Sequence, residues 1–239
     1  MAYQNSTSIV PRTALKNAVC AAVLCALGLG AAQAASLRMV TGSVQVVRDG
    51  NVIPATQSMR LKPGDVLETD PAKQDAGATG GGEALVRFDD GARLALRNGS
   101  SFEIQELQLK GPVATRQKII NVIKGSLRYI SGVATVRQKV TFTTSTATIG
   151  IRGTDIEIVV SDDVVQDNNP GTYLKVNTGA AVLTAPDGAA VDVAPGEVAY
   201  GGEPELTTRG GSPRRAAARK VQTTGTGMFK SSSLDRLMN

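Results

Sequence analysis

The sequence predicts an all-β protein, either a short-stranded twisted β-solenoid or a jelly-roll-like sandwich, followed by a disordered C-terminal tail. From Ala35 to Gly202, short runs of β-branched and other apolar residues alternate with polar residues. Turn-forming pairs such as Asp49-Gly50, Pro63-Gly64 and Asp187-Gly188 separate these runs at short intervals. No stretch of this region has a convincing 3.6-residue period, so we expect no helices in it.

Residues 1–34 have the features of a cleavable secretory signal peptide. Arg12 and Lys16 form a basic region, residues 18–31 are apolar, and Ala32-Gln33-Ala34 is an A-x-A cleavage site. This pattern predicts export to the periplasm of a Gram-negative bacterium, or secretion.

A single membrane anchor is the alternative for this segment, but its uncharged run is shorter than the ~20 residues that a span needs. A lipid anchor is disfavoured because neither Cys20 nor Cys25 lies in a lipoprotein-type signal. We therefore expect the mature chain to begin at Ala35.

Composition narrows the chemistry of the mature chain. Both cysteines lie in the signal segment and the chain has no histidine, which excludes disulfides, thiol nucleophiles and the usual zinc sites. Composition leaves catalysis by serine, lysine or paired carboxylates open, but no G-x-S-x-G nucleophile motif is present. Residues 35–202 carry 17 lysines and arginines against 18 acidic residues, so this body is nearly neutral. We expect no enzyme activity and no cofactor.

The first half of the body predicts a series of hairpins. A hairpin over Leu37–Ala55 turns at Asp49-Gly50, and Pro63-Gly64 precedes the next strand. The glycine-rich stretch 70–82 is expected to be a surface loop; a phosphate-binding loop is disfavoured because no Lys-Ser/Thr and no helix follow it. Three strands are expected over 83–107.

Further strands are expected over 119–130, as a pair with a turn at Lys124-Gly125-Ser126. After residue 160, an acidic turn precedes short strands at 172–176, 181–184, 191–193 and 198–200. Clustered carboxylates and amides in that turn raise the possibility of calcium, but their spacing matches no known loop, so we assign no metal.

The stretch Ala147–Val160 predicts a strand, a sharp corner and a second strand. Gly150 and Gly153 flank the corner and are expected to supply backbone angles or close approach that a Cβ would prevent. Arg152 lies within it and is expected to bind buried backbone or carboxylate acceptors. The alternative is that Arg152 faces solvent and binds an anionic ligand or a carboxylate of a partner.

Segments of the body resemble one another. The stretch 42–50 is similar to 179–188, 90–96 is similar to 187–193, and 62–66 is similar to 194–198. Recurring strand and turn units of this kind are typical of a β-solenoid or a sandwich.

Residues 203–239 differ in character from the body, with seven basic residues against three acidic ones and many Gly, Ser and Thr residues. This composition predicts a disordered basic tail. Arg214, Arg215, Arg219 and Lys220 could contact an anionic lipid or polymer, and a merely solubilising tail is the alternative.

Six motifs occur in a fixed order along the body. They are Gly42–Val46, Leu61–Thr69 with Gly64 and Asp65, Asp90–Leu96, Gly125–Tyr129, Ile149–Ile156 with Arg152-Gly153-Thr154, and Pro195-Gly196-Glu197. Together they resemble the FecR-type periplasmic domain family. With the signal and tail patterns described above, this gives three parts: a signal peptide (1–34), a FecR-like domain (35–202) and a disordered basic tail (203–239).

This resemblance implies an all-β domain that works outside the cytoplasmic membrane in sensing or protein contact. We identify no anti-sigma segment, membrane helix or C-terminal transporter-contacting domain, so we carry over only the single domain. The family signature, for which we expect structural roles, consists of Gly64, Asp65, Gly150, Arg152, Gly153, Thr154, Gly196 and Glu197.

The resulting hypothesis is a non-enzymatic periplasmic module that binds a protein or ligand in envelope sensing or signalling. The expected partner is a periplasmic or outer-membrane protein, with no nucleic acid involved because the excess basic charge lies outside the body. A polysaccharide- or cell-wall-binding envelope protein is the alternative, although aromatic residues form only 3% of the chain. A purely structural envelope component is a third hypothesis.

Overall fold

The computed structural model describes residues 35–71, 81–132, 138–164, 168–203, 217–221, 228–229 and 231–238. The predicted signal peptide, loop residues 72–80 and part of the predicted acidic turn lie outside these ranges. Within the described ranges, no helix is long and apolar enough to cross a membrane. The elements are β1 (Ala35–Thr41), β2 (Val44–Arg48), β3 (Asn51–Pro54), β4 (Arg60–Leu61), β5 (Val66–Thr69), β6 (Glu83–Phe88), β7 (Arg93–Leu96), β8 (Ser101–Gln108), η1 (Val113–Thr115), β9 (Gln117–Ile130), β10 (Lys139–Thr143), β11 (Thr148–Ser161), β12 (Gly171–Thr184), β13 (Ala190–Val193), β14 (Val198–Gly201), β15 (Ala218–Val221) and α2 (Ser231–Met238).

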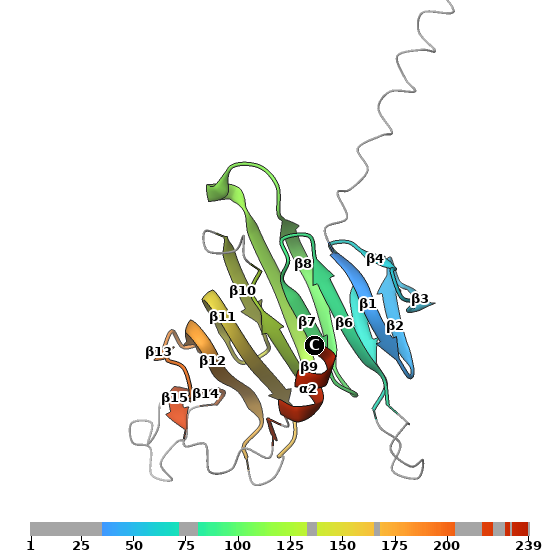
Figure 1. The fold of residues 1–239 in the computed structure, drawn as a ribbon. Helices are drawn as coiled ribbons and strands as arrows, with labels where there is room; N and C mark the ends of the chain where they lie inside the picture. The colour runs from blue at the N-terminus through green and yellow to red at the C-terminus, as the bar shows by residue number, and fades with distance from the viewer. Residues whose placement is uncertain are drawn as a thin grey trace, which may run out of the picture. The chain divides into compact units, whose positions relative to one another are not determined.

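The strands belong to one continuous, open sheet, which confirms the all-β prediction. Its main path runs β15-β14-β12-β11-β10-β9-β7-β6-β1-β4, so β13, β14 and β15 lie at one end and β4 at the other (Figure 1). β2, β3, β5 and β8 branch from this path through β9. Among the described pairings, β9 with β10 is parallel and the rest are antiparallel.

β9, β11 and β12 each have 14 residues and change partners along their length. The first half of β9 pairs with β8 and β10, and its second half pairs with β7 and β11. The predicted turn at Lys124-Gly125-Ser126 is therefore wrong, because β9 continues through it. The predicted separate strands 172–176 and 181–184 are likewise two halves of β12.

Glycines lie where these long strands bend. Gly153 has a φ of +58°, and the pairing of β11 with β12 shifts register between Arg152 and Asp155. Opposite it, Gly179 has a φ of +84°, and a Cβ there would lie 2.4 Å from the carbonyl oxygen of Gly153. An L-residue would be strained at both positions. The corner predicted in Ala147–Val160 is a bulge within the continuous strand β11, and not a break between two separate strands.

Three aromatic rings pack together in the core, and one charged lysine side chain lies beside them. The ring of Tyr129 lies 6.3 Å from that of Phe88 and 5.1 Å from that of Phe142, both in edge-on geometry. Lys118 is fully buried beside them, with Nζ 2.9 Å from Asp90 Oδ2 and 3.8 Å above the Phe88 ring. Burial lowers the pKa of Lys118 to about 8, although Asp90 raises it.

Two turns with similar sequences also have the same hydrogen bonds. In the turns 62–65 and 194–197, the glycine N–H donates over 2.8 Å to a neighbouring strand, at Ile104 O and Val176 O respectively. In each turn the last side chain, Asp65 or Glu197, accepts a 2.8 Å bond from the first N–H. The sequence similarity of these segments is therefore a similarity of structure.

The two turns differ in how their carboxylates are buried. Asp65 is 1% exposed and accepts bonds of 2.7 and 2.6 Å from the guanidinium of Arg48. The Glu197 carboxylate is 36% exposed and contacts Lys220 at 2.7 Å. The hydrogen bond from Lys220 and then that from the Ala194 N–H lower the pKa of Glu197.

A line of charged side chains crosses β9, β11 and β12. Arg128 donates to both oxygens of Asp155, at 2.9 and 2.7 Å. Asn177 bridges Asp155 and Glu157, at 3.3 and 3.1 Å, and Lys175 lies 3.2 Å from Glu157. The hydrogen bond that Arg128 donates to Asp155 is the main reason that the pKa of Arg128 is raised.

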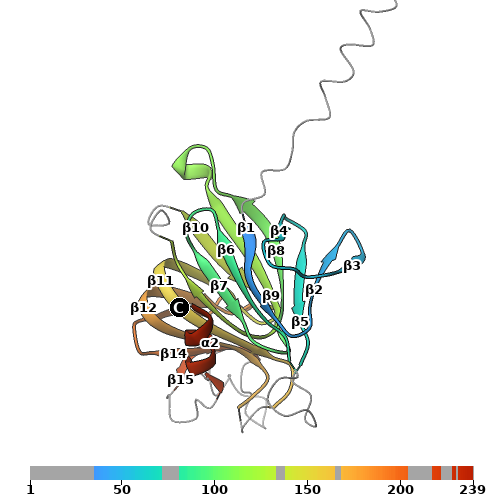
Figure 2. The same ribbon diagram turned by 45° about the vertical axis from the view of Figure 1, so that its right-hand side comes forward.

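The described part of segment 203–239 is more ordered than the sequence predicts. β15 pairs with β14, and Figures 1 and 2 show α2 alongside β7. Arg236 contacts Glu83 at 2.7 Å, and Arg128 hydrogen-bonds Asp235. The physical reason is a set of buried apolar side chains that pack on the sheet: Met228, Phe229, Leu234, Leu237 and Met238. The rest of this segment lies outside the described residues.

Truncation after Val221 should therefore lower the melting temperature, by roughly 5–10 °C, because apolar surface on the sheet loses its cover. Thermal unfolding followed by circular dichroism measures this. The substitutions Leu234→Asn and Leu237→Asn in the full chain should have the same direction of effect. A truncated chain that melts within about 1 °C of the full chain would show that the segment does not stabilise the fold.

Removal of the carboxylate should lower the free energy of unfolding more in the turn 62–65 than in the turn 194–197. Asp65→Ala should destabilise the protein by about 3 kcal/mol, because it removes two charge-assisted bonds and leaves the half-buried Arg48 without them. Glu197→Ala should cost much less, because its carboxylate is open to solvent. Urea unfolding of both variants tests the comparison, and equal losses would contradict it.

Lys118 predicts a pH dependence of stability. Its pKa is lower in the folded state, so the unfolded chain binds more protons above pH 8 and the free energy of unfolding rises with pH. Relative to Lys118→Met, the wild type should gain about 1–2 kcal/mol between pH 8 and pH 9.5. Urea titrations at the two pH values give this difference, and a constant difference would refute the buried-charge assignment.

Candidate functional site

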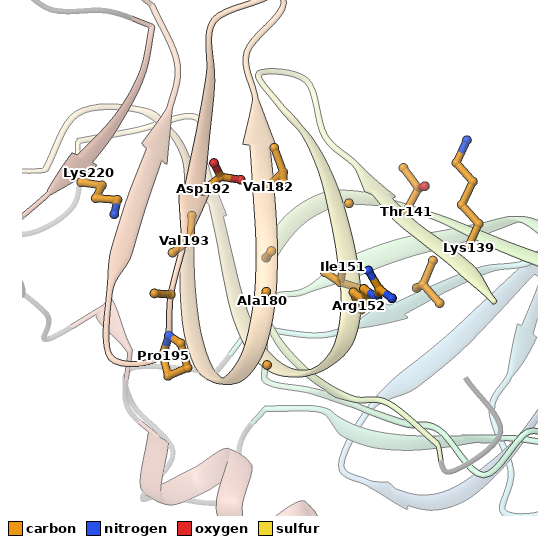
Figure 3. Close-up of a pocket in the computed structure, with 15 residues that line it drawn as sticks. Lys139, Thr141, Ile151, Arg152, Ala180, Val182, Asp192, Val193, Pro195 and Lys220 are labelled. Atoms are coloured by element: carbon orange, nitrogen blue, oxygen red, sulfur yellow. The ribbon is translucent and has the colours of Figure 1, made fainter. Parts of the chain in front are cut away.

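A surface groove lies beside the corner of β11. It has a volume of about 750 Å³ and crosses β10, β11, β12 and β13. Figure 3 shows its labelled side chains, with Arg152 and Ile151 on one strand and Val182 and Ala180 on the next. Its lining consists of Lys139, Val140, Thr141, Gly150, Ile151, Arg152, Gly179, Ala180, Ala181, Val182, Asp192, Val193, Ala194, Pro195 and Lys220.

The floor of the groove is made of small and apolar residues that lie in register. Gly150 pairs with Thr141 on one side and with Val182 on the other, and Val182 pairs with Asp192. Val182 is 40% exposed, which is unusual for a valine in the middle of a paired strand. The backbone groups of this floor already bond within the sheet, so the groove offers a ligand mainly apolar contact.

Gly150 keeps this floor open. Its φ does not lie in the left-handed region, and a Cβ placed on it would meet no atom within 4 Å. The expectation that the backbone requires glycine at this position is therefore wrong. A side chain at position 150 would instead extend into the groove, next to Val182.

Positive charge lies on two sides of the groove. Arg152 and Lys139 occupy neighbouring positions on adjacent strands, one residue beyond the Val140 and Ile151 pair. Both side chains are exposed, and neither has a hydrogen bond or ion pair with another described residue. Lys220 lies on the other side of the groove and contacts Glu197.

The structure separates the signature residues into two groups. Gly150 and Arg152 line the groove, so the structural role expected for Arg152 is not supported by any contact among the described residues. Gly153 and Thr154 form the bulge itself, where the Thr154 N–H donates over 3.1 Å to Ser131 Oγ. Thr154 is 2% exposed and does not line the groove.

The two turn motifs also divide. Gly196 and Glu197 follow Pro195, which lines the groove, and Glu197 holds Lys220 at its edge. Gly64 and Asp65 lie in the turn before β5, which contributes no residue to the groove. The structure therefore brings the corner and the second turn together, but not the first turn.

Of the four basic tail residues singled out in the sequence, two lie in β15. The guanidinium of Arg219 stacks over the Tyr200 ring at 4.4 Å, and Lys220 pairs with Glu197. Arg214 and Arg215 lie outside the described residues. Arg219 and Lys220 thus contact their own domain.

Sequence reasoning missed the apolar floor on β12. The stretch Gly179–Leu183 is apolar at every position, whereas a strand with one wet face should alternate. This lack of alternation is the signal that could have identified Ala180 and Val182 as part of the groove. Within the described ranges, no group of three or more acidic, cysteine or histidine side chains could hold a metal ion.

Comparisons with known protein families identify one family that matches the chain. The FecR protein family matches residues 75–198, a range that includes the corner of β11 and the groove strands β10 to β13. No curated protein matches the chain significantly.

Two crystal structures of a candidate anti-sigma factor from Parabacteroides distasonis ATCC 8503, at 2.50 and 1.65 Å resolution, are similar in structure. Each has a TM-score of 0.43 and 11% sequence identity, with 70% and 69% of this chain covered. The matched region spans 63% of the length of those chains. On the strength of the family match over more than half of its length, the chain belongs to the FecR protein family.

Proposed function

We propose that the chain is a non-enzymatic binding module of the bacterial periplasm, and that it takes part in envelope signalling by holding a partner in the groove on β10 to β13. The FecR family consists of regulatory rather than catalytic proteins, which supports a signalling role. The signal peptide predicted over 1–34 supports the location. The expected partner is a periplasmic or outer-membrane protein.

The observation that carries this proposal is that Gly150 and Arg152 do nothing visible for the fold. Glycine inside a strand weakens the strand, and no backbone angle requires it here. Exposed arginine and lysine on adjacent strands repel each other without a described counter-ion. Residues that cost stability without a structural role are typical of a binding surface.

The groove also has the composition of a recognition site. A concavity of about 750 Å³ with an apolar floor and a few charged groups at its margins is typical of sites that bind a ligand or an anchoring side chain. Arg152 and Lys139 favour a partner with a carboxylate or another anionic group. The exposed Val182 favours an apolar anchor beside it.

The polysaccharide-binding alternative gains no support. Binding of sugar rings relies on exposed aromatic side chains. Phe88, Phe102, Tyr129, Phe142, Tyr173, Tyr200 and Phe229 are the aromatic residues within the described ranges, and all seven are buried. A protein partner with an acidic and apolar segment fits the groove better.

Gly150→Leu and Arg152→Ala should abolish partner capture and leave the fold intact. We expect the free energy of unfolding to stay within about 0.5 kcal/mol for Arg152→Ala, and to stay equal or rise for Gly150→Leu. Capture is measured by affinity purification from periplasmic extract with quantitative mass spectrometry, and stability by urea unfolding.

Two matched controls lie outside the groove. Val52→Leu adds bulk at a strand position that is 61% exposed, and Lys124→Ala removes a charge from an exposed position of β9. Both should capture the same partner as the wild type. If the two groove variants and the controls capture the same proteins in equal amounts, the groove is not the partner site.

A further inference from the structure

A second concavity, the arginine cleft, lies across β1, β6 and β7 next to the end of α2. Its volume is about 520 Å³, and it shares no residue with the groove. Arg38, Arg87 and Arg93 come from three neighbouring strands and line it together with Leu85, Ile130 and Met238. The sequence analysis did not single out any of these residues.

The pairing of the strands places these arginines close to one another. Arg87 of β6 lies directly opposite Arg93 of β7, as a register pair of two antiparallel strands. Arg38 lies at the irregularity in β1, between Leu37 and Met39, where β1 pairs with β6. Like charges directly opposite each other on a sheet destabilise it. The fold therefore holds three positive charges together at a cost.

Among the described residues that line the cleft, none is acidic and could offset this charge. The side chains of Arg38 and Arg87 have no hydrogen bond or ion pair with any described residue, and the Arg93 guanidinium donates to the backbone oxygen of Met238. The carboxylates of the surrounding segments are bound elsewhere: Glu83 by Arg236, Asp89 by Arg60, Asp90 by Lys118, and Asp155 and Asp235 by Arg128.

We propose that the arginine cleft is a binding site for a phosphate group. Three guanidinium groups present more hydrogen-bond donors and more charge than one carboxylate can satisfy, whereas a phosphate has up to two negative charges and several acceptor oxygens. The apolar side chains of Leu85 and Ile130 beside the arginines would contact the organic part of a phosphate ester. Such a site would add phosphate binding to the proposed function, at a place that shares no residue with the groove.

The phosphate group could belong to a lipid headgroup or to a soluble phosphate compound. The first experiment uses inorganic phosphate and measures the melting temperature of the full chain against phosphate concentration, with chloride and succinate at matched ionic strength. Wild type should melt several degrees higher in saturating phosphate, because a ligand that binds the folded state stabilises it. Chloride and succinate should have little effect.

Arg87→Thr separates binding from folding. In phosphate-free buffer the variant should melt at the same temperature as the wild type or higher, because the repulsion with Arg93 is removed. It should bind phosphate roughly tenfold more weakly or worse, and its phosphate-dependent rise in melting temperature should disappear. Arg38→Thr should behave in the same way. Lys124→Thr removes one charge from an exposed position of β9 and should keep the wild-type response.

Cosedimentation with phosphatidylcholine vesicles, with and without phosphatidic acid, then assigns the source. Arginine-dependent sedimentation with phosphatidic acid supports a lipid headgroup, and a response to inorganic phosphate alone supports a soluble phosphate compound. Equal melting temperatures in phosphate and chloride, an equal rise in succinate, or a full response in Arg87→Thr would each overturn the proposal. Since Arg87 lies outside the groove, partner capture by that variant shows separately whether the proposed function holds.

Discussion

β11 and β12 can each serve two sets of neighbours because their paired backbones bend together at Gly153 and Gly179. A Cβ on Gly179 would lie 2.4 Å from the carbonyl oxygen of Gly153, so the two strands approach too closely there for any other residue. Both glycines also have positive φ angles, which L-residues adopt only with strain. The first half of β11 then pairs with β10, and the second half pairs with β9. The rest of the sheet depends on this bend, because β11 and β12 connect β13 and β14 on one side to β9 and β10 on the other.

The bend also gives the same two strands two different surfaces. Beyond it, the polar face of β11 and β12 carries Asp155, Glu157 and Lys175, which are bound by one another and by Arg128. On the other side of the bend, Gly150 and Arg152 face the open groove. One stretch of sequence therefore supplies both an ionic network whose members pair with one another and an exposed surface whose charged side chains have no partner among the described residues.

Local chemistry made part of this fold predictable. Turns built on Asp49-Gly50 and Pro63-Gly64 depend on neighbouring residues alone, and the similarity of 62–65 to 194–197 proved to be a similarity of hydrogen bonds. Gly125 misled the prediction because Lys-Gly-Ser reads locally as a turn. What decides it is the contact of Gly125 with Ser100, where a Cβ would lie 2.4 Å from the hydroxyl oxygen. Such contacts between distant segments cannot be seen in a local pattern, and the same holds for the apolar residues near the C-terminus that pack on the sheet.

The candidate sites were harder to foresee, because they consist of residues that the fold does not explain. Gly153 and Arg152 are neighbours in one signature, yet the first is required by backbone geometry, whereas the side chain of the second has no hydrogen bond or ion pair with a described residue. The motif alone cannot distinguish a residue that the backbone geometry requires from a residue that could bind a partner. In the structure, the two roles differ in the hydrogen bonds that would be lost if each side chain were removed. Removing Arg152 or Arg87 deprives the described fold of no hydrogen bond, and removing Arg87 also relieves repulsion with Arg93. Charges held at such a cost are best explained by a ligand that supplies the missing negative charge.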